Sequence, residues 1–348
     1  MPLSGSPLLS VVVPARNAAE TLPFCLAALE RSAAGRAQVI VVDDGSTDGT
    51  GELARAAGVE VIRHEVASGP ARARNVGAGS AASDIVLFVD ADVVIADDAV
   101  TRVLEAFEAD ADLTAVFGSY DDAPGGRTLV SDYRNLLHHF VHQSSRADSA
   151  SFWAGCGAVR KAAFLAVGGF DERYCRPSIE DIELGGRFAR GGYRVRLDKR
   201  LTGRHLKNWT LAGLVVVDVR DRAYPWASLM LRQGRIPADL NLQYSHRVSA
   251  ALVWAGIACL TGLGAGLAAG WRTPVQAAFV VGFGAAVVAT ALLNRGFYRF
   301  LLDRRGIRFV AAAFVLHALY YAYASATFAW CWVHHHTMGA ARLGEAVV

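Results

Sequence analysis

The sequence predicts an α/β domain with a largely parallel sheet, followed by helices at and across a membrane. Short apolar runs alternate with helical stretches through about residue 205. Two of these runs end in closely spaced carboxylates, and the last hundred residues contain three long stretches without a charged residue. Strands that alternate with helices are typical of a sheet covered by helices on both faces. With 348 residues, the chain is long enough for such a domain and a second, membrane-associated part.

Apolar runs that are rich in valine and isoleucine predict the strands. These runs are Leu9–Val13, Val39–Val42, Val59–Ile62, Ile85–Val89 and Leu113–Phe117, with Tyr193–Leu197 as the last sheet segment. Leucines at helical spacing predict a helix between the first two strands. The helical segments are the one marked by Leu22, Leu26 and Leu29, then Ala71–Ala82 and Asp97–Ala109.

The most informative feature is the triplet Asp90-Ala91-Asp92, which directly follows the strand Ile85–Val89. A buried strand that ends in two acids places both at the carboxyl edge of the sheet, where α/β proteins bind ligands. Two such carboxylates can hold a hard divalent cation that also binds substrate phosphates. The alternative for an isolated Asp-x-Asp is a cap for the next helix. Its meaning therefore depends on the motifs around it.

A second acidic motif follows the strand Val39–Val42 and reads Asp43-Asp44-Gly45-Ser46. Gly45 and Ser46 permit a tight turn before a helix, which we expect to be capped near Thr47 or Asp48. Carboxylates at this position can accept hydrogen bonds from the imide N–H of a base and from ribose hydroxyls. The first strand ends in a similar turn, so we expect the two turns to form one nucleotide pocket.

In their order and spacing, these motifs resemble the family-2 glycosyltransferases over roughly residues 8–205. The matching segments are the strand that ends in Pro14, Asp43–Asp48, Gly69–Asn75 (Gly-x-x-x-Ala-Arg-Asn), Asp90–Asp92, and Gly168–Glu172 followed by Glu180-Asp181. Each motif is a modest match alone, and the ordered set is specific. Cys156, between Gly155 and Gly157, departs from the small or polar residue expected there.

The resemblance implies a GT-A-type, Rossmann-like fold that binds a nucleoside-diphosphate sugar. The implied nucleotide-sugar contacts are Pro14, Ala15, Asp43, Asp44, Arg74, Asp90 and Ala91. A Mg²⁺ or Mn²⁺ ion would be held chiefly by Asp92, with Asp90 and His205 as further ligands, and it would offset charge on the departing diphosphate. Arg204 and Lys207 are candidate phosphate contacts.

On the acceptor side, the resemblance implies that Asp181 is the general base. Glu180, Gly155 and Trp153 would face the acceptor. A single displacement without a protein nucleophile would invert the anomeric centre. The alternative for Glu180-Asp181 is a pair of acids that stabilises the first turn of a helix, and the alternative for His205 is a structural histidine.

The remainder of the chain predicts membrane association. Residues 206–247 combine apolar stretches with Trp and Arg, which is typical of helices that lie at a membrane surface. Spans are expected at about 248–270, 274–293 and 309–333, with a short tail at 334–348. Arginines crowd the connection between the second and third spans, so the positive-inside rule places this connection and the catalytic domain on the cytosolic side of the cytoplasmic (inner) membrane. We expect no signal peptide, because residues 1–10 contain no Lys or Arg and only a short apolar stretch precedes Pro14.

These features predict a multi-pass, inverting glycosyltransferase that acts on a membrane-associated lipid or lipid-linked glycan. A net charge of +3 gives no reason to expect nucleic acid as a partner, and five scattered cysteines are expected to be reduced. Two alternatives stay open. One is a processive polysaccharide synthase subunit, although residues 243–247 lack a Gln-x-x-Arg-Trp signature. The other is a catalytically inactive membrane scaffold.

Overall fold

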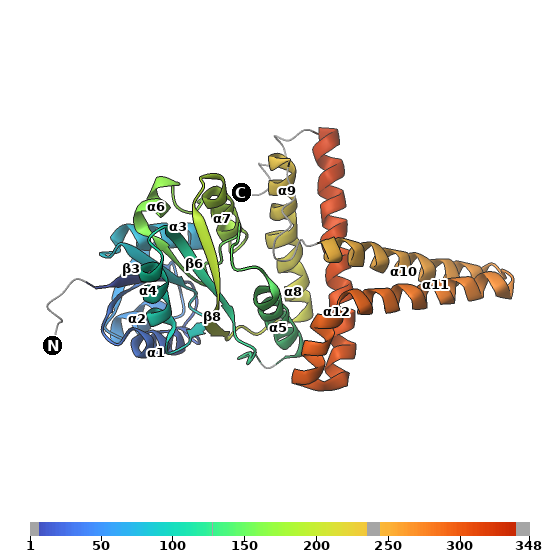
Figure 1. Cartoon of the computed structure of the whole chain (residues 1–348), viewed down its shortest axis with the longest axis horizontal. Helices are drawn as coiled ribbons and strands as arrows, with labels where there is room; N and C mark the ends of the chain where they lie inside the picture. Colours follow the sequence, from blue (N-terminus) through green and yellow to red (C-terminus); the bar gives the residue numbers. More distant parts are fainter. Residues whose placement is uncertain (1–6, 127, 235–243, 339–348) are drawn as a thin grey trace. The chain divides into compact units, whose positions relative to one another are not determined.

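The computed structural model describes residues 7–126, 128–234 and 244–338. Residue contacts divide the chain into two compact units, with the division between Thr210 and Leu211. The first unit is an α/β domain, and the second consists of helices (Figure 1). The predicted fold class is therefore confirmed, with differences in the sheet and in the helices that follow it.

The first unit is built on an eight-stranded sheet with the order β3-β2-β1-β4-β7-β6-β8-β5. The strands are β1 (Leu9–Ala15), β2 (Ala37–Asp44), β3 (Glu60–His64), β4 (Ile85–Val89), β5 (Val93–Ile95), β6 (Leu113–Tyr120), β7 (Cys156–Arg160) and β8 (Arg194–His205). Strands β3, β2, β1 and β4 run parallel to one another, so their carboxyl ends meet at one edge. Strand β7 is antiparallel to β4 and β6, and β5 is antiparallel to β8. Because β6 also pairs parallel with β8, six of the eight strands run in one direction, as predicted for a largely parallel sheet, and only β5 and β7 run against them.

Helices cover both faces of this sheet (Figure 1). They are α1 (Leu22–Ala33), α2 (Thr50–Ala56), α3 (Pro70–Ser80), α4 (Ala99–Ala109), α5 (Leu129–Ser144), α6 (Lys161–Ala166) and α7 (Glu180–Arg190). One buried cluster packs α1 and α4 on one face through Leu29 and Val103. A second cluster packs α3 and α7 on the other face through Ala73 and Phe188. Burial of these apolar faces holds the helices against the sheet.

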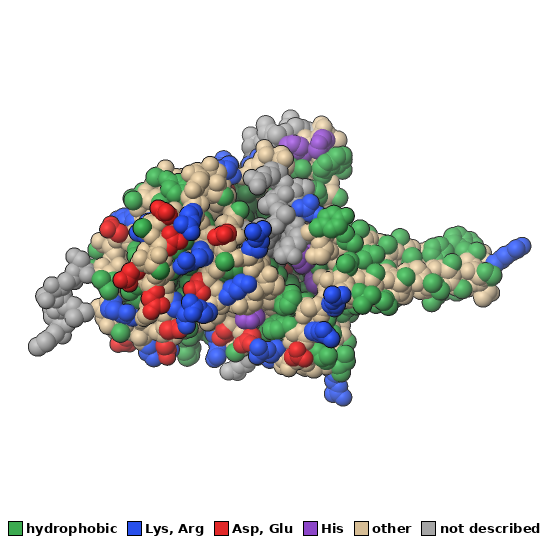
Figure 2. Space-filling model, in the orientation of Figure 1, with side chains coloured by type: hydrophobic (Ala, Val, Ile, Leu, Met, Phe, Trp, Pro, Cys, Tyr) green, Lys and Arg blue, Asp and Glu red, His purple; other side chains and the backbone are tan. Residues whose placement is uncertain are grey.

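The second unit begins with an uninterrupted helical run and continues with three long helices. The elements are α8 (Leu211–Val217), the π-helix η1 (Asp218–Ala223), α9 (Tyr224–Gln233), α10 (Tyr244–Ala268), α11 (Thr273–Leu293) and α12 (Arg295–Met338). Helices α10 and α11 lie side by side (Figure 1), and hydrophobic side chains cover most of their visible surface (Figure 2). In the part of the chain that the structure describes, α10, α11 and α12 are long and apolar enough to cross a membrane.

The arginine-rich segment after α11 is helical, whereas the sequence analysis assigned no helix to this connection between two spans. It forms the first part of α12, and Gly306 interrupts that helix with φ 78° and ψ 175°. Phe297 and Leu301 are buried, so the segment packs one apolar face while its arginines stay outside. The helix also continues through residues 334–338, which were predicted to belong to the tail.

Three hydrogen bonds join α10, α12 and the junction between α11 and α12. Asn294 donates from Nδ2 to Ser249 Oγ at 2.9 Å, and Tyr321 donates from its hydroxyl to Asn294 Oδ1 at 2.9 Å. His246 Nδ1 lies 2.8 Å from the same Tyr321 hydroxyl. Polar contacts of this kind hold apolar helices in register.

Candidate active site

The Asp43 carboxylate is enclosed at the carboxyl end of β2. Its Oδ1 accepts a hydrogen bond from the Ser46 backbone N–H at 3.0 Å, and its Oδ2 accepts one from Arg63 Nη1 at 2.5 Å. Arg63 also donates to the Ser46 carbonyl at 3.1 Å. An added Cβ at Gly51 would come within 2.4 Å of Asp43 Oδ2, so α2 approaches the acid closely. Asp43 therefore shapes the turn that follows β2.

Asp44 holds the loop that leads into α3. Its carboxylate accepts hydrogen bonds from the backbone N–H groups of Ser68 and Gly69, both at 2.8 Å, and lies 2.8 Å from His64 Nδ1. Gly69 has a φ of +95°, and a Cβ there would meet the Cys175 carbonyl oxygen at 2.4 Å. The loop fixed by Asp44 is thus in backbone contact with the loop that precedes α7.

The turns after β1 and β2 are joined by hydrogen bonds. Pro14 and Ala15 end β1 opposite Val42 and Asp43. Asn17, with a φ of +48°, donates its backbone N–H to Ser46 Oγ at 3.0 Å and accepts from the Thr47 N–H at 2.9 Å. Asparagine is among the residues that adopt this left-handed conformation most readily.

The next helix, α2, begins at Thr50 with Gly49 as its N-cap, next to the cap predicted near Thr47 or Asp48. The Asp48 carboxylate accepts hydrogen bonds from the Thr50 N–H at 3.1 Å and from the Ala19 N–H at 3.0 Å. Hydrogen bonds therefore join the two turns into one edge, where the sequence predicts a nucleotide pocket.

Asp90 is connected to α7 by a buried arginine. Arg74 of α3 donates from Nη2 to Asp90 Oδ1 at 2.7 Å and from Nη1 to Glu180 Oε1 at 2.8 Å. Its side chain is only 6% exposed, and its guanidinium carbon lies 5.4 Å from the centroid of the Phe170 ring. The two carboxylates hold the pKa of Arg74 above its usual value despite burial, which acts to lower it. A direct contact between Arg74 and a nucleotide would require one of these ion pairs to open.

Asp181 lies in the first turn of α7, next to Glu180. It is half-buried, and its carboxylate accepts hydrogen bonds from the Ile182 N–H at 2.8 Å and the Ala154 N–H at 3.2 Å. Burial and the negative charge of Glu180 raise the pKa of Asp181 to about 7, against the lowering effects of Arg74 and of the two N–H donors. A carboxylate with this pKa can take up a proton near neutral pH.

Asp92 faces His205, which the pairing of β5 with β8 brings opposite Val93. Asp92 Oδ2 lies 3.4 Å from His205 Nε2, and 28% of the Asp92 side chain is exposed. Burial acts to raise the pKa of Asp92, but the charges of His205 and Lys207 hold it below its usual value. Asp92 thus stays ionised beside two basic side chains.

This pair fits a divalent cation only if the ligand supplies further oxygens. Within the described residues, no group of three or more His, Cys, Asp and Glu side chains is arranged to hold a metal. Asp90 Oδ1 is engaged by Arg74, which leaves Asp92 and His205 as the nearest candidate ligands. Mg²⁺ commonly binds through one or two carboxylates together with substrate phosphates and water. The donor set therefore fits a cation that arrives with a diphosphate.

Trp153 and Gly155 lie beside the end of β4. The Gly155 carbonyl accepts a hydrogen bond from the Asp90 N–H at 3.2 Å, and a Cβ at Gly155 would come within 2.4 Å of the Trp153 ring. Trp153 packs edge-on against Tyr120 with ring centroids 4.8 Å apart. Cys156 is fully buried, and burial together with Asp90 raises the pKa of its thiol to about 12, so it is an inert packing residue.

The structure thus brings Asp90, Asp92, Asp181 and His205 to the region where β4, α7 and β8 end or begin. The sequence reasoning placed Asn17 in the turn after β1, but it did not single out Arg63, which binds Asp43, or Tyr120, which stacks on His205. An asparagine directly after a strand is a readable signal of a tight turn. The contacts of Arg63 and Tyr120 depend on strand order, which the sequence did not give.

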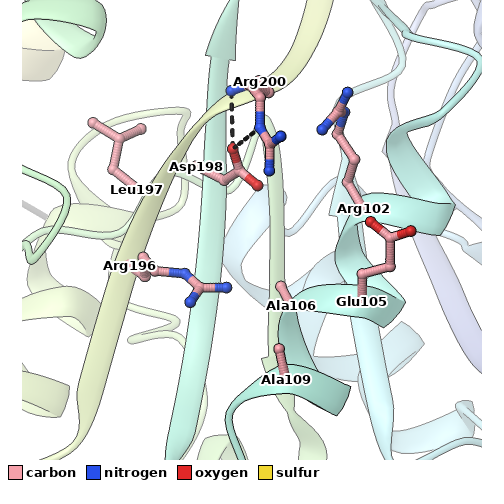
Figure 3. Close-up of a pocket in the computed structure, with 8 residues that line it drawn as sticks. All are labelled: Arg102, Glu105, Ala106, Ala109, Arg196, Leu197, Asp198 and Arg200. Carbon is pink, nitrogen blue, oxygen red and sulfur yellow. Dashed lines mark hydrogen bonds and ion pairs between the residues drawn. The ribbon is translucent and has the colours of Figure 1, made fainter.

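A separate hollow lies between α4 and β8 and contains none of the predicted site residues (Figure 3). Three arginines extend toward it, and Asp198 interacts with one of them (Figure 3). Its lining consists of Arg102, Glu105, Ala106, Ala109, Arg196, Leu197, Asp198 and Arg200. Because it lacks the acids and the histidine described above, we do not assign the chemistry to it.

Comparison with known proteins matches residues 10–168 to the family model described as "Glycosyl transferase family 2". The succinoglycan biosynthesis protein ExoA of Rhizobium meliloti is 29% identical over 321 residues, which cover 85% of this chain and 95% of that protein. The pre-mycofactocin glycosyltransferase of Mycobacterium tuberculosis is 27% identical over 73% of this chain, which spans about half (53%) of that relative. Helix α7 and strand β8 lie beyond the segment matched by the family model.

Among solved structures, the chain is similar to the mannosyltransferase PcManGT from Pyrobaculum calidifontis in complex with GDP-Man and Mn²⁺. The two share 19% sequence identity with a TM-score of 0.59, over 94% of this chain and 88% of the other. At this identity the similarity describes the fold alone, a GT-A-like domain followed by apolar helices.

Proposed function

We propose that this chain, a glycosyltransferase whose residues 10–168 form a family 2 domain, moves a sugar from a nucleoside diphosphate to a membrane-associated acceptor with inversion. The family resemblance predicted from the motifs is confirmed by the family match. The proposal for mechanism rests chiefly on one observation. The ion-paired series Asp90–Arg74–Glu180 connects the end of β4 with the start of α7, which supports a shared role for Asp181, next to Glu180, and the partly exposed acids Asp90 and Asp92.

In the proposed reaction, an acceptor hydroxyl attacks the anomeric carbon of the donor sugar. The new bond joins the acceptor oxygen to this carbon, and the bond from the carbon to the diphosphate oxygen breaks. The proton of the hydroxyl passes to the Asp181 carboxylate, and the diphosphate leaves with the electron pair. General base catalysis of this kind contributes about 10²–10⁴-fold.

Residues on the donor side bind and orient the diphosphate. Asp92 and His205 are suited to hold a Mg²⁺ or Mn²⁺ ion, which when bound would offset charge on the leaving group. Lys207 adds a positive charge beside Asp92. The turns joined by Asn17 and Ser46 form the wall against which we place the base and ribose, with Pro14, Ala15 and Ala91 as the proposed contacts. Asp43 and Asp44, which the sequence predicted as direct contacts, are enclosed by the chain and are proposed to shape this wall instead.

The acceptor is proposed to be a lipid or a lipid-linked glycan. Three long apolar helices would hold the domain at the bilayer, and the arginines of the first part of α12 favour a cytosolic position for that segment by the positive-inside rule. We therefore propose that the active site faces the cytosol at the inner membrane. Glu180, Gly155 and Trp153 are the proposed acceptor-side residues.

The test is release of nucleoside diphosphate by the purified protein, with a panel of nucleotide sugars, divalent metal and a lipid extract. We expect release of nucleoside diphosphate that depends on both donor and lipid. In Asp181→Asn, we expect the rate of this release to fall by about 10³-fold. Asp112→Asn, an exposed acid at the opposite end of β6 from Tyr120, is the matched control. Equal release by wild type and Asp181→Asn would refute the proposed mechanism.

Product analysis separates the remaining alternatives. A discrete glycolipid supports single transfer, whereas a long polymer indicates a processive synthase. If Asp92→Ala leaves the cellular phenotype of the wild type unchanged, the protein acts as a scaffold instead.

A further inference from the structure

Tyr120 and His205 face each other from two different strands. Tyr120 is the last residue of β6 and pairs with Gly203 of β8, two residues before His205. The two rings are stacked, with centroids 4.4 Å apart and an interplanar angle of 9°. The register between β6 and β8 shifts just before this point, and the shift brings the end of β8 alongside Tyr120.

The His205 ring has few polar contacts that could orient it. Within the described ranges, its ring interacts with Asp92 through Nε2, and we find no hydrogen bond to Nδ1. Metal-binding histidines usually donate their second ring N–H to a carboxylate, a carbonyl or water, which fixes the orientation of the ring. Among the residues that the structure describes, no protein group fills this role for His205, whereas the Tyr120 ring lies flat against its face.

Tyr120 is itself held from three sides. The His138 and Trp153 rings lie 4.3 Å and 4.8 Å from its ring, and its backbone carbonyl lies 2.7 Å from His139 Nδ1. Both histidines belong to α5, which is thereby tied to the end of β6. The stacking surface presented to His205 is therefore rigid.

We propose that Tyr120 is a positioning residue, which holds the His205 imidazole in the plane that directs Nε2 toward the cation beside Asp92. Its flat ring replaces the hydrogen bond that usually orients such a histidine. The inference rests on the proposed role of Asp92 and His205 in binding a divalent cation. It requires the aromatic face of Tyr120 and not its hydroxyl.

Mn²⁺ binding by the full chain in detergent tests this role without any turnover. The electron paramagnetic resonance signal of free Mn²⁺ is followed as protein is titrated in, with UDP or GDP supplied as the diphosphate. We expect Tyr120→Phe to bind Mn²⁺ within about twofold of wild type, and Tyr120→Met to bind about tenfold more weakly, which is typical for loss of a residue that orients a ligand. Tyr120→Leu serves as a second non-aromatic variant.

Tyr193→Leu is the matched control, because it removes an aromatic contact with Phe188 in the same sheet domain. We expect this control to lower the melting temperature and to leave the affinity for Mn²⁺ unchanged. Wild-type affinity in Tyr120→Met or Tyr120→Leu would overturn the positioning role. Absence of Mn²⁺ binding in the wild type with both nucleotides would instead overturn the metal site itself, and a loss in Tyr120→Phe equal to that in Tyr120→Met would assign the effect to the hydroxyl.

Discussion

The carboxylates of Asp43 and Asp44 are closed off from solvent at the end of β2, with side chains 0% and 5% exposed. Those of Asp90 and Asp92, after the end of β4, are 31% and 28% exposed. In the first pair both oxygens of each acid accept hydrogen bonds from the chain itself. In the second pair, Arg74 and His205 each engage one oxygen. Similar sequence patterns thus build the frame in one place and leave carboxylates partly open to solvent in the other, where we propose that the donor binds.

The largest effect should come from the exposed pair. Asp92→Asn should lower kcat/KM by about 10³-fold, since it removes a charge that acts on the leaving group. Its free energy of unfolding should change by less than about 1 kcal/mol, because the side chain is partly exposed and its ion pair is long. Donor turnover and thermal unfolding, measured on one preparation, check the predictions for kcat/KM and for stability. If Asp92→Asn lowers stability and leaves activity unchanged, Asp92 is a structural acid like Asp43 and Asp44.

The enclosed pair should show the opposite behaviour. Asp44→Ala removes the acceptor of two backbone N–H groups, and we expect it to lower the free energy of unfolding by about 3 kcal/mol. Asp44→Asn keeps one acceptor oxygen, so it should lower the free energy of unfolding by less than Asp44→Ala. Thermal unfolding in detergent measures both variants. If Asp44→Ala is as stable as wild type and only its affinity for the donor falls, Asp44 belongs with the ligand-facing acids.

The pH dependence should distinguish Asp92 from Asp181. The pKa of Asp92 is lowered, so it stays ionised throughout the working range, whereas the pKa of Asp181 is raised from 3.8 to about 7. Activity should therefore rise about tenfold per pH unit below 7 and level off above it.

The same raised pKa means that the folded state binds the Asp181 proton more tightly than the unfolded state. The contribution of this group to stability is full below about pH 4 and is lost as pH rises through about 7. Rate profiles and melting curves across this range test both statements. A rate profile that stays flat from pH 5 to 8 would exclude Asp181 as the group that limits activity.

The smallest expected effect comes from a steric contact with the enclosed acid Asp43. Gly51→Ala puts a methyl group against Asp43 Oδ2, which should cost about 1–2 kcal/mol of unfolding free energy without altering the metal requirement. Gly79→Ala is the matched control, because a Cβ there meets nothing within 4 Å and the site is helical. It should be neutral or slightly stabilising. Equal losses in the two variants would show that contact with Asp43 is not the cause.

The sequence was informative where local chemistry dictates structure. The apolar runs before Asp43 and Asp90 predicted β2 and β4, because a buried strand needs a continuous apolar run. The helix in the arginine-rich segment was not predicted, because its buried face consists only of Phe297, Leu301 and their neighbours. So few buried residues give a weak helical pattern in the sequence. Strand β5 has three residues and β7 has five, so neither carries a clear pattern.

The direction of β7 and the pairing of β5 with β8 are long-range properties. They decide that Trp153 lies near Asp90 and that His205 faces Asp92. Neither contact could be read from spacing along the chain. The roles assigned to the individual site residues stay predictions until the variants above are measured.

The backbone contact between Gly69 and Cys175 has a consequence for how this domain can evolve. Gly69 belongs to the loop held by Asp44, and Cys175 belongs to the loop that leads to Asp181. The two loops are in contact through backbone atoms, so a side-chain rearrangement cannot compensate for a change in either loop. We expect homologous chains to change these two loops together in length and sequence. A loop grafted from a relative with different sugar specificity should then function only when its counterpart is transferred with it.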